Sequence, residues 1–156
     1  MNTVLNEVKL MLNIDPEHNS ANSEIERLGA KDVFDLNQFQ LLSAYTCTEC
    51  GRCSSECPAN ITGKLLSPRS IMMKTRDRLE EVGNNINKNK QFLDDNKSLL
   101  GDYIKKEEIW ACTTCNACGD ACPIELDHMS IIIDLRRYLV MEKSSAPSEL
   151  NTMFNN

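Results

Sequence analysis

Hydrophobic residues recur along this chain with a helical period, and a strand-like alternation is hardly visible. Asn37 can cap a helix over 38–45, which leads directly into a run of cysteines. A Ser-Pro pair at 67–68 is typical of a helix start, with serine as the cap and proline in the first turn. The pattern that follows predicts a helix over 68–82, which Gly83 can end.

The second half of the chain shows the same period. The polar, turn-rich stretch 84–98 predicts a surface loop, and the segment KKEEIW at 105–110 predicts a short helix running into a second group of cysteines. Asp127 can cap a longer helix over 128–143, in which apolar residues form one stripe. We therefore expect a mainly α fold.

Composition and charge exclude several function classes. The formal net charge is -6 and the isoelectric point is near 5.0, so the basic surface that nucleic acid requires is missing. The longest apolar runs, such as 131–133, are far shorter than the roughly 18 residues of a membrane-spanning helix. Charged residues interrupt the first twenty positions, where a signal peptide has an unbroken apolar region. These features predict a cytoplasmic protein.

All eight cysteines fall in two runs of the same form. The segments CTECGRCSSECP (47–58) and CTTCNACGDACP (112–123) align without a gap, and every cysteine in the first has a counterpart 65 residues later. Both runs end in proline. Disulfide frameworks spread cysteines between elements in order to staple them, so two tight clusters argue against a disulfide scaffold and for metal.

The spacing C-x2-C-x2-C-x3-C-P is that of bacterial ferredoxins, in which the fourth cysteine binds the other cluster of a pair. Three cysteines at steps of three wrap the chain around one cubane, and the proline turns the chain away without leaving an unpaired N–H group. The sequence thus predicts two [4Fe-4S] clusters. The first is assigned to Cys47, Cys50, Cys53 and Cys122, and the second to Cys112, Cys115, Cys118 and Cys57.

Two other interpretations of these thiols stay open at this point. Four-cysteine zinc sites also use C-x2-C pairs, and the eight thiolates could hold two zinc ions in a structural adaptor. Zinc sites normally take one pair from each of two knuckles, whereas here a triplet and a fourth cysteine precede proline in both copies. The second alternative is an iron–sulfur protein that regulates or senses, although no DNA-binding element is visible.

The stretch from about residue 29 to residue 156 resembles the heterodisulfide-reductase-related (Fe-S)-binding proteins of bacteria, particularly the Bacteroidetes versions. The cysteine motif is common to many ferredoxins, but TGKLLSP and DLRRYLV are typical of this group. The resemblance implies an α-helical ferredoxin fold, like that of the iron–sulfur subunit of succinate dehydrogenase and the C-type subunit of heterodisulfide reductase. It divides the chain into an N-terminal helix and polar linker (1–28), a dicluster ferredoxin-type domain (29–143) and a C-terminal tail leading out of the domain (144–156).

The same resemblance implies an electron-transfer component of a membrane-linked oxidoreductase, with no substrate site of its own in this chain. Its expected partners are a flavoprotein or dehydrogenase donor and a quinone- or disulfide-linked acceptor, with no nucleic acid. Larger members of the group carry transmembrane helices before this segment and cysteine-rich domains after it. We therefore expect a segment of a larger protein, in the cytoplasm or at the cytoplasmic face of the inner membrane, that meets the membrane only through missing segments or partners.

Several charged residues near the motifs have simple expected roles. Arg52 and Glu49 lie between the cysteines of the first run and are expected to shift the potential of the first cluster in opposite directions. His128 is expected to be a polar residue at a helix start, not a ligand, because eight cysteines already complete two cubanes. The pair 136–137, two arginines, is expected to form a solvated face.

Overall fold

Helices and turns make up the described part of the chain. A computed structural model describes residues 28–154, and within that range it contains no β-strand, only an isolated bridge between Leu100 and Ile104. The mainly α prediction is confirmed. The helix and linker predicted for residues 1–28 lie, except for Leu28, outside the described residues. The described elements are, in chain order, η2 (Val33–Asp35), α2 (Gln38–Thr46), α3 (Arg52–Ser55), α4 (Pro58–Ile61), α5 (Pro68–Asn89), η3 (Leu99–Tyr103), α6 (Lys106–Trp110), α7 (Ala117–Asp120), α8 (His128–Arg137), η4 (Tyr138–Glu142) and α9 (Ser148–Phe154).

Helix α5 is longer than its sequence pattern predicts. It follows the Ser67 cap, as expected, but it runs through Gly83 and ends only at Asn89. The next residue, Lys90, takes a left-handed conformation with φ 64°. A glycine inside a helix costs only about 1 kcal/mol, too little to end a helix that is held on both sides. The extra turns are held by Asn85, whose side chain accepts from the Leu93 amide at 3.2 Å and donates to the Leu93 carbonyl at 2.7 Å.

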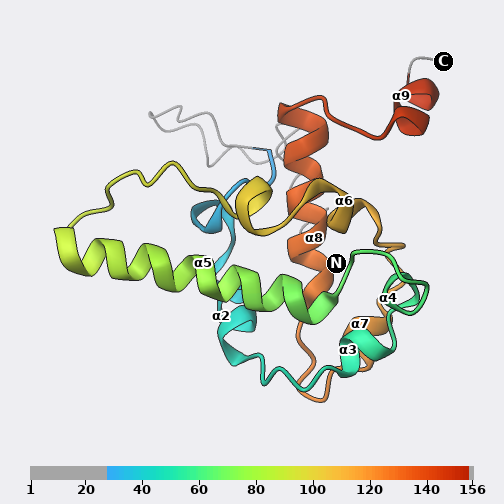
Figure 1. The fold of residues 1–156 in the computed structure, drawn as a ribbon, viewed down its shortest axis with the longest axis horizontal. Coiled ribbons are helices and arrows are strands. Elements are labelled where there is room, and N and C mark those ends of the chain that lie inside the picture. Colours follow the sequence, from blue (N-terminus) through green and yellow to red (C-terminus); the bar gives the residue numbers. More distant parts are fainter. Residues whose placement is uncertain (1–27, 155–156) are drawn as a thin grey trace, which may run out of the picture.

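The main apolar core lies where α5 passes α8 and the short helix α6 (Figure 1). Ile71 and Met72 of α5, Ile109 of α6, and Ile131 and Leu135 of α8 have no exposed surface there. Burying an aliphatic side chain of this size stabilises a fold by about 1.5–3 kcal/mol, so this crossing dominates the packing. The predicted helices over 38–45, 105–110 and 128–143 are confirmed, the last with a π-helical end, η4.

A fully buried arginine, which sequence reasoning did not single out, ties α5 to two loops. The guanidinium of Arg78 donates to the Asp32 carboxylate at 2.8 and 3.1 Å, to Asp95 at 2.5 Å and to the Lys97 carbonyl at 2.8 Å. Asp32 also accepts from the Leu99 amide at 3.1 Å. This network joins the start of the described chain, the middle of α5 and the loop before η3.

Close backbone packing holds the start of the described chain against α8. The Ala30 amide donates to the Asp134 carbonyl at 2.9 Å. Gly29 has φ +93°, and a Cβ atom built there would lie 2.4 Å from the Tyr138 backbone nitrogen. Only glycine fits this contact, because any other residue would meet both the steric clash and the left-handed backbone.

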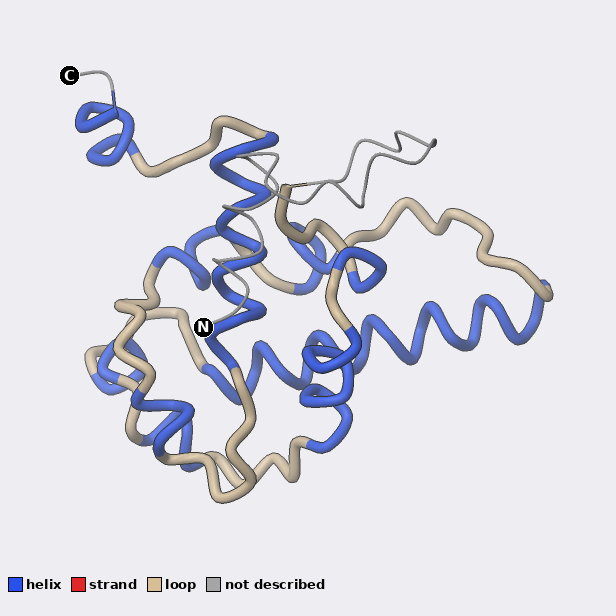
Figure 2. The backbone as a smooth tube through the Cα atoms, turned by 180° about the vertical axis from the view of Figure 1, so that it is seen from behind, coloured by secondary structure: helices blue, strands red, loops and turns tan. Residues whose placement is uncertain are grey.

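The short helices α3, α4 and α7 gather at one end of the molecule, away from the free end of α5 (Figure 1). The view from behind shows the same loops side by side (Figure 2). Helix α9 lies within the predicted tail and projects from the end of α8 (Figure 1). Within residues 28–154, no helix is both long enough and apolar enough to cross a membrane.

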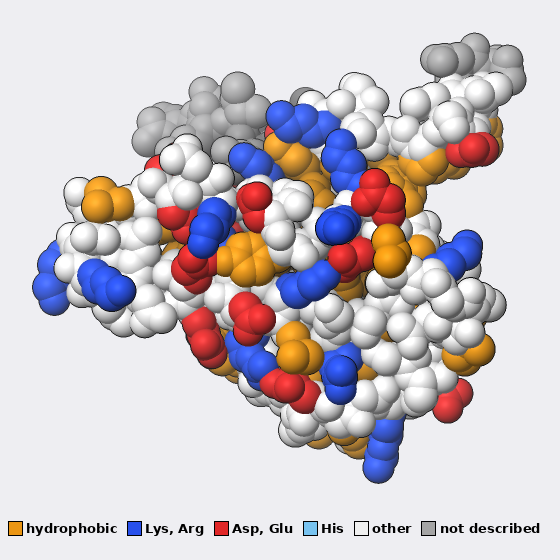
Figure 3. Space-filling model, in the orientation of Figure 1, with side chains coloured by type: hydrophobic (Ala, Val, Ile, Leu, Met, Phe, Trp, Pro, Cys, Tyr) orange, Lys and Arg blue, Asp and Glu red, His pale blue; other side chains and the backbone are white. Residues whose placement is uncertain are grey.

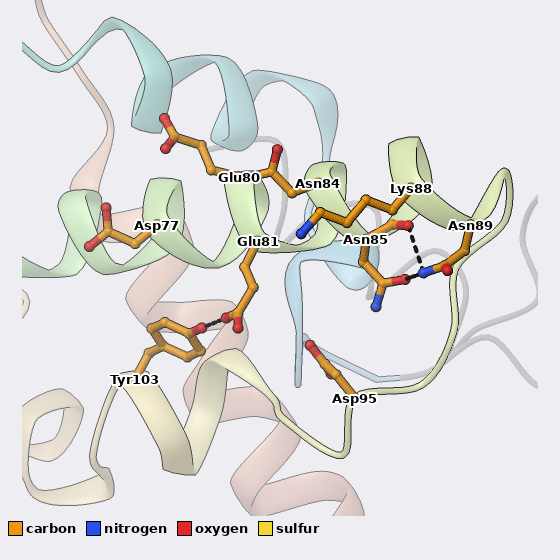
Figure 4. A pocket seen from close by; sticks show the side chains of 9 residues that line it. All are labelled: Asp77, Glu80, Glu81, Asn84, Asn85, Lys88, Asn89, Asp95 and Tyr103. Carbon is orange, nitrogen blue, oxygen red and sulfur yellow. Dashed lines mark hydrogen bonds between the residues drawn. The ribbon is translucent and has the colours of Figure 1, made fainter.

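The surface over α5 carries charges of both signs, interspersed rather than gathered (Figure 3). Between α5 and η3 a polar groove of about 670 Å³ is lined by carboxylates and amides, among them Asp77, Glu81 and Asp95. In the close view the hydroxyl of Tyr103 donates to Glu81 across this groove (Figure 4). No cysteine lines it, so the groove is separate from the thiol chemistry.

Candidate functional site

The first cysteine loop is shaped by helix ends. Cys47 directly follows the last residue of α2, and Gly51 precedes α3 with φ 83°, in the left-handed region that favours glycine. Cys53 is buried within α3, and Cys57 is the buried N-cap of α4, whose first residue is Pro58. Proline has no N–H group that would need a partner in the first turn, so α4 can begin directly after Cys57.

The second loop repeats the backbone of the first. Thr114 (φ 56°) takes the conformation of Glu49 (φ 59°), and Asn116 (φ 62°) takes that of Gly51. Asparagine is among the few other residues that adopt this conformation readily, so the two loops can differ in sequence and keep one shape. In the second loop the Thr114 amide donates to Cys112 Sγ at 3.4 Å. One backbone amide therefore points at a sulfur that is predicted to be a ligand.

Four thiols from both motifs line one hollow. The hollow is lined by the four cysteines assigned to the first cluster, Cys47, Cys50, Cys53 and Cys122. Its other lining residues include Arg69, Ile124, Leu126 and His128. Three come from one loop and the fourth from a loop 65 residues further on, which is the donor set that a cubane needs. Among the described residues, no three Cys, His, Asp or Glu side chains form a site for a single ion. The four cysteines that line the hollow would hold a cubane, with one thiolate on each iron.

A second group of sulfur atoms lies between the two loops. Cys53 and Cys118 pack with the buried Met129, and Cys112 contacts the same group, with its Sγ atom 3.8 Å from Met129 Sδ. Cys115 is exposed. Cys57, assigned to the second cluster, is buried in the main core, against which Cys112 also packs. Met129 therefore lies in one packed group with cysteines assigned to both clusters.

Burial and backbone amides act in opposite directions on the thiols. Desolvation raises the pKa of Cys118 to about 12, and it raises the pKa of Cys53 as well. The backbone amide of Ala117, with help from the Thr113 side chain, lowers the pKa of the exposed Cys115. Metal and cluster ligands are thiolates, so loading this site must release protons from the two buried cysteines.

His128 lies at the start of α8, as predicted, and it is buried. Its side chain is 1% exposed and lines the hollow, and Nδ1 lies 3.0 Å from the Leu126 carbonyl, so a neutral ring donates there. Burial lowers the pKa of His128 below its usual value of 6.5.

We expect the loaded protein to lose stability as the pH falls below the usual histidine value. In the unfolded chain His128 takes up a proton near pH 6.5, whereas in the folded chain its pKa is lower. The free energy of unfolding is therefore highest above pH 6.5 and declines below it. Denaturant unfolding under anaerobic conditions between about pH 5 and 8 measures this slope. His128→Gln should flatten it, because it removes the histidine whose pKa is lowered in the folded chain. An unchanged slope in His128→Gln would contradict the expectation.

The cations beside the cysteines come mostly from helices remote in sequence. Glu49 is ion-paired with Arg76 of α5, and Arg52 is exposed. Arg69, at the start of α5, lines the first hollow. The prediction of a solvated face at 136–137 is wrong for both arginines. Arg136 is half-buried and donates to the carbonyls of residues 109 and 112. The side chain of Arg137 is only 14% exposed.

Sequence reasoning missed Arg69 because nothing local links it to the cysteines. For Arg136, the apolar stripe of α8 already indicated that the side chain could be partly buried. The arginine follows Leu135 at the edge of the buried face, and its neighbour Arg137 instead pairs with Asp134 at 2.9 Å.

Comparison with known proteins identifies the kind of site. The family model described as "4Fe-4S dicluster domain" matches residues 46–126. A probable iron-sulfur-binding oxidoreductase of Bacillus subtilis (strain 168) is 40% identical over 80% of this chain and 22% of its own length. An EtfAB:quinone oxidoreductase of Syntrophomonas wolfei is 30% identical over 85% of this chain and 21% of its own length. The C-type subunit of a ferredoxin/F(420)H(2)-dependent CoB-CoM heterodisulfide reductase of Methanosarcina acetivorans is 26% identical over 76% of this chain and 60% of its own length.

The chain spans about a fifth of the length of the first two relatives. The predicted resemblance to heterodisulfide-reductase-related iron–sulfur proteins is confirmed, and so are the two [4Fe-4S] clusters, in place of zinc. With iron–sulfur oxidoreductases as relatives, the chain is an electron-transfer module. Because the family model covers both cysteine motifs and about half of the sequence, the chain belongs to the 4Fe-4S dicluster domain family.

Proposed function

We propose that this chain relays single electrons from a flavoprotein or dehydrogenase donor to a quinone- or disulfide-linked acceptor. It does so within a membrane-linked oxidoreductase of the heterodisulfide-reductase-related type. The observation that carries the proposal is the single hollow lined by Cys122 of one motif and three cysteines of the other. Loops interlocked in this way keep two redox centres at a fixed short separation. The relative whose name specifies a quinone as its substrate supports this acceptor class.

Buried and exposed cysteines would have different roles in such a relay. When bound, the clusters supply one-electron chemistry. Cys53, Cys57 and Cys118 are buried and hold the inner side of the site, where Leu126 and Met129 exclude water. Cys50 and Cys115 are exposed and mark the sides from which partners can approach. Because each motif has one exposed cysteine, a donor can approach one cluster and an acceptor the other.

A relay must cycle without losing its clusters. We expect the loaded chain to be reduced by a low-potential donor and reoxidised by a water-soluble quinone through repeated rounds, with constant iron and acid-labile sulfide. Stopped-flow absorbance under anaerobic conditions measures both half-reactions. Conversion or loss of the clusters in the first oxidation would instead favour a sensor.

The crossed ligand sets give a separate prediction. If Cys57 serves the second cluster, Cys57→Ser should change the EPR spectrum of the cluster held by Cys112, Cys115 and Cys118. The altered signal should match the one that changes in Cys112→Ser. A match to Cys47→Ser would show that each motif binds its own cluster with all four of its cysteines.

We also propose that residues 29–143 form the cluster-binding domain and that partners place it at the cytoplasmic face of the inner membrane. The tight contact of Gly29 with the end of α8 supports the first boundary. The kinship with oxidoreductases several times longer than this chain supports attachment through other segments or subunits. Fractionation of cells with and without the neighbouring subunits tests the location.

A further inference from the structure

The guanidinium of Arg136 is held beside the second cysteine loop. On α8, Arg136 donates from Nε and Nη2 to the Ile109 carbonyl at 3.0 and 2.6 Å, and from Nη2 to the Cys112 carbonyl at 2.5 Å. The guanidinium lies over the Trp110 ring, 5.1 Å from its centroid. Helices α6 and α8 are in contact (Figure 1), so the cation is fixed between the end of α6 and the first ligand of the second cluster.

Within the described residues, Arg136 has no carboxylate partner, unlike the adjacent Arg137. Within residues 28–154, the observed ion pairs use Lys74, Arg76, Arg78, Lys97 and Arg137, and none includes Arg136. Arg136 is half-buried, and burying a charge is costly unless an opposite charge is near. Carbonyl dipoles and an aromatic face meet this need only in part. The thiol of Cys112, the residue whose carbonyl Arg136 binds, is a group that can become anionic and stabilise this cation.

We propose that Arg136 is the counter-charge of the second cluster, held by Cys112, Cys115 and Cys118, and that it raises the reduction potential of that cluster. The inference rests on the proposed relay and names a positioning residue within it. Reduction adds a negative charge, and a fixed cation in a partly buried site stabilises that charge more than a cation in water does. Arg69, beside the first cluster, is exposed, so salt screens it more strongly. Arg136 therefore places the second cluster at a higher potential than its thiolates alone would set.

The test compares the cluster-loaded 156-residue chain with its Arg136→Gln and Arg136→Lys variants. Redox titration followed by EPR gives the potential of each cluster, and iron and sulfide analysis gives its occupancy. We expect Arg136→Gln to lower the potential of the second cluster by about 59 mV, a tenfold change in its reduction equilibrium. The first cluster should shift less, and added salt should change the difference little. Arg136→Lys keeps the charge but not the two-pronged hydrogen bonds, so it should stay close to the unsubstituted protein.

The control is Arg137→Gln, which removes an adjacent charge paired with Asp134 and should leave both potentials unchanged. If Arg136 acts only by holding the loop, the Lys and Gln variants will behave alike, and that result overturns the proposal. If Arg136→Gln loses the second cluster, iron content becomes the readout. Retention of that cluster in Arg136→Lys then supports the counter-charge role, whereas loss of the cluster in both variants overturns it. Failure of the unsubstituted chain to cycle with donor and quinone would refute the relay alone, because the potentials are measured without either partner.

Discussion

Replacing Arg78 by methionine is expected to lower the free energy of unfolding by about 3–5 kcal/mol, the usual cost of removing one partner from a buried ion pair. The Arg78 side chain has no exposed surface, and the side chains of its partners Asp32 and Asp95 are 13% and 19% exposed. Without the guanidinium, two carboxylates lose their cationic partner and the Lys97 carbonyl loses its hydrogen bond from Arg78. For a domain of ordinary stability, about 5–15 kcal/mol in total, this is a large fraction.

Urea unfolding of the cluster-loaded protein under anaerobic conditions measures this effect. The matched control is Arg76→Met, two residues earlier on α5, which removes only the partly exposed pair with Glu49 and should cost no more than about 1 kcal/mol. Arg78→Lys should fall between the two, since it keeps the charge and loses the forked hydrogen bonds. Equal losses in Arg78→Met and Arg76→Met would mean that the network contributes nothing beyond a surface pair.

Removing the clusters is expected to unfold one end of the molecule and spare the other. Helices α3, α4 and α7 have four residues each, far below the roughly 12–15 residues at which an isolated helix becomes even marginally stable. In the loaded protein the bound cysteines hold these turns. Helices α5 and α8 instead share a fully buried apolar contact that includes Ile71 and Ile131. We therefore expect their packing to survive the loss of iron.

Hydrogen exchange resolved by segment tests this division. After chelation under reducing conditions, amides in 47–62 and 112–123 should exchange about a hundredfold faster or more, at tenfold for each 1.4 kcal/mol of lost local stability. Amides in α5 and α8 should keep most of their protection. The loaded protein in the same buffer is the reference. Simultaneous loss of protection in both regions would show that the clusters organise the whole core.

Local patterns in the sequence determined most of the helices and are sufficient to predict the ligands. A cap such as Asn37 or Asp127 acts on the amides of the next turn, and α2 and α8 begin where these residues predict. The spacing of the two cysteine runs is sufficient to predict iron–sulfur clusters, because the distance between thiolates in a tight loop depends on a few backbone angles. Gly51 and Asn116 illustrate this, since their types already permit the left-handed turns that both loops contain.

Tertiary structure decided which distant groups surround those ligands. Helix α5 passes Gly83 because Asn85 binds Leu93 across the following turn, a contact that no local propensity contains. Likewise, Arg78 is buried only because Asp32 and Asp95, 46 and 17 residues away, converge on it. Arg136 meets the second cysteine loop for the same reason. Charges act through space, so the partner of a cation depends on how helices cross, and that follows from the packing of the whole chain.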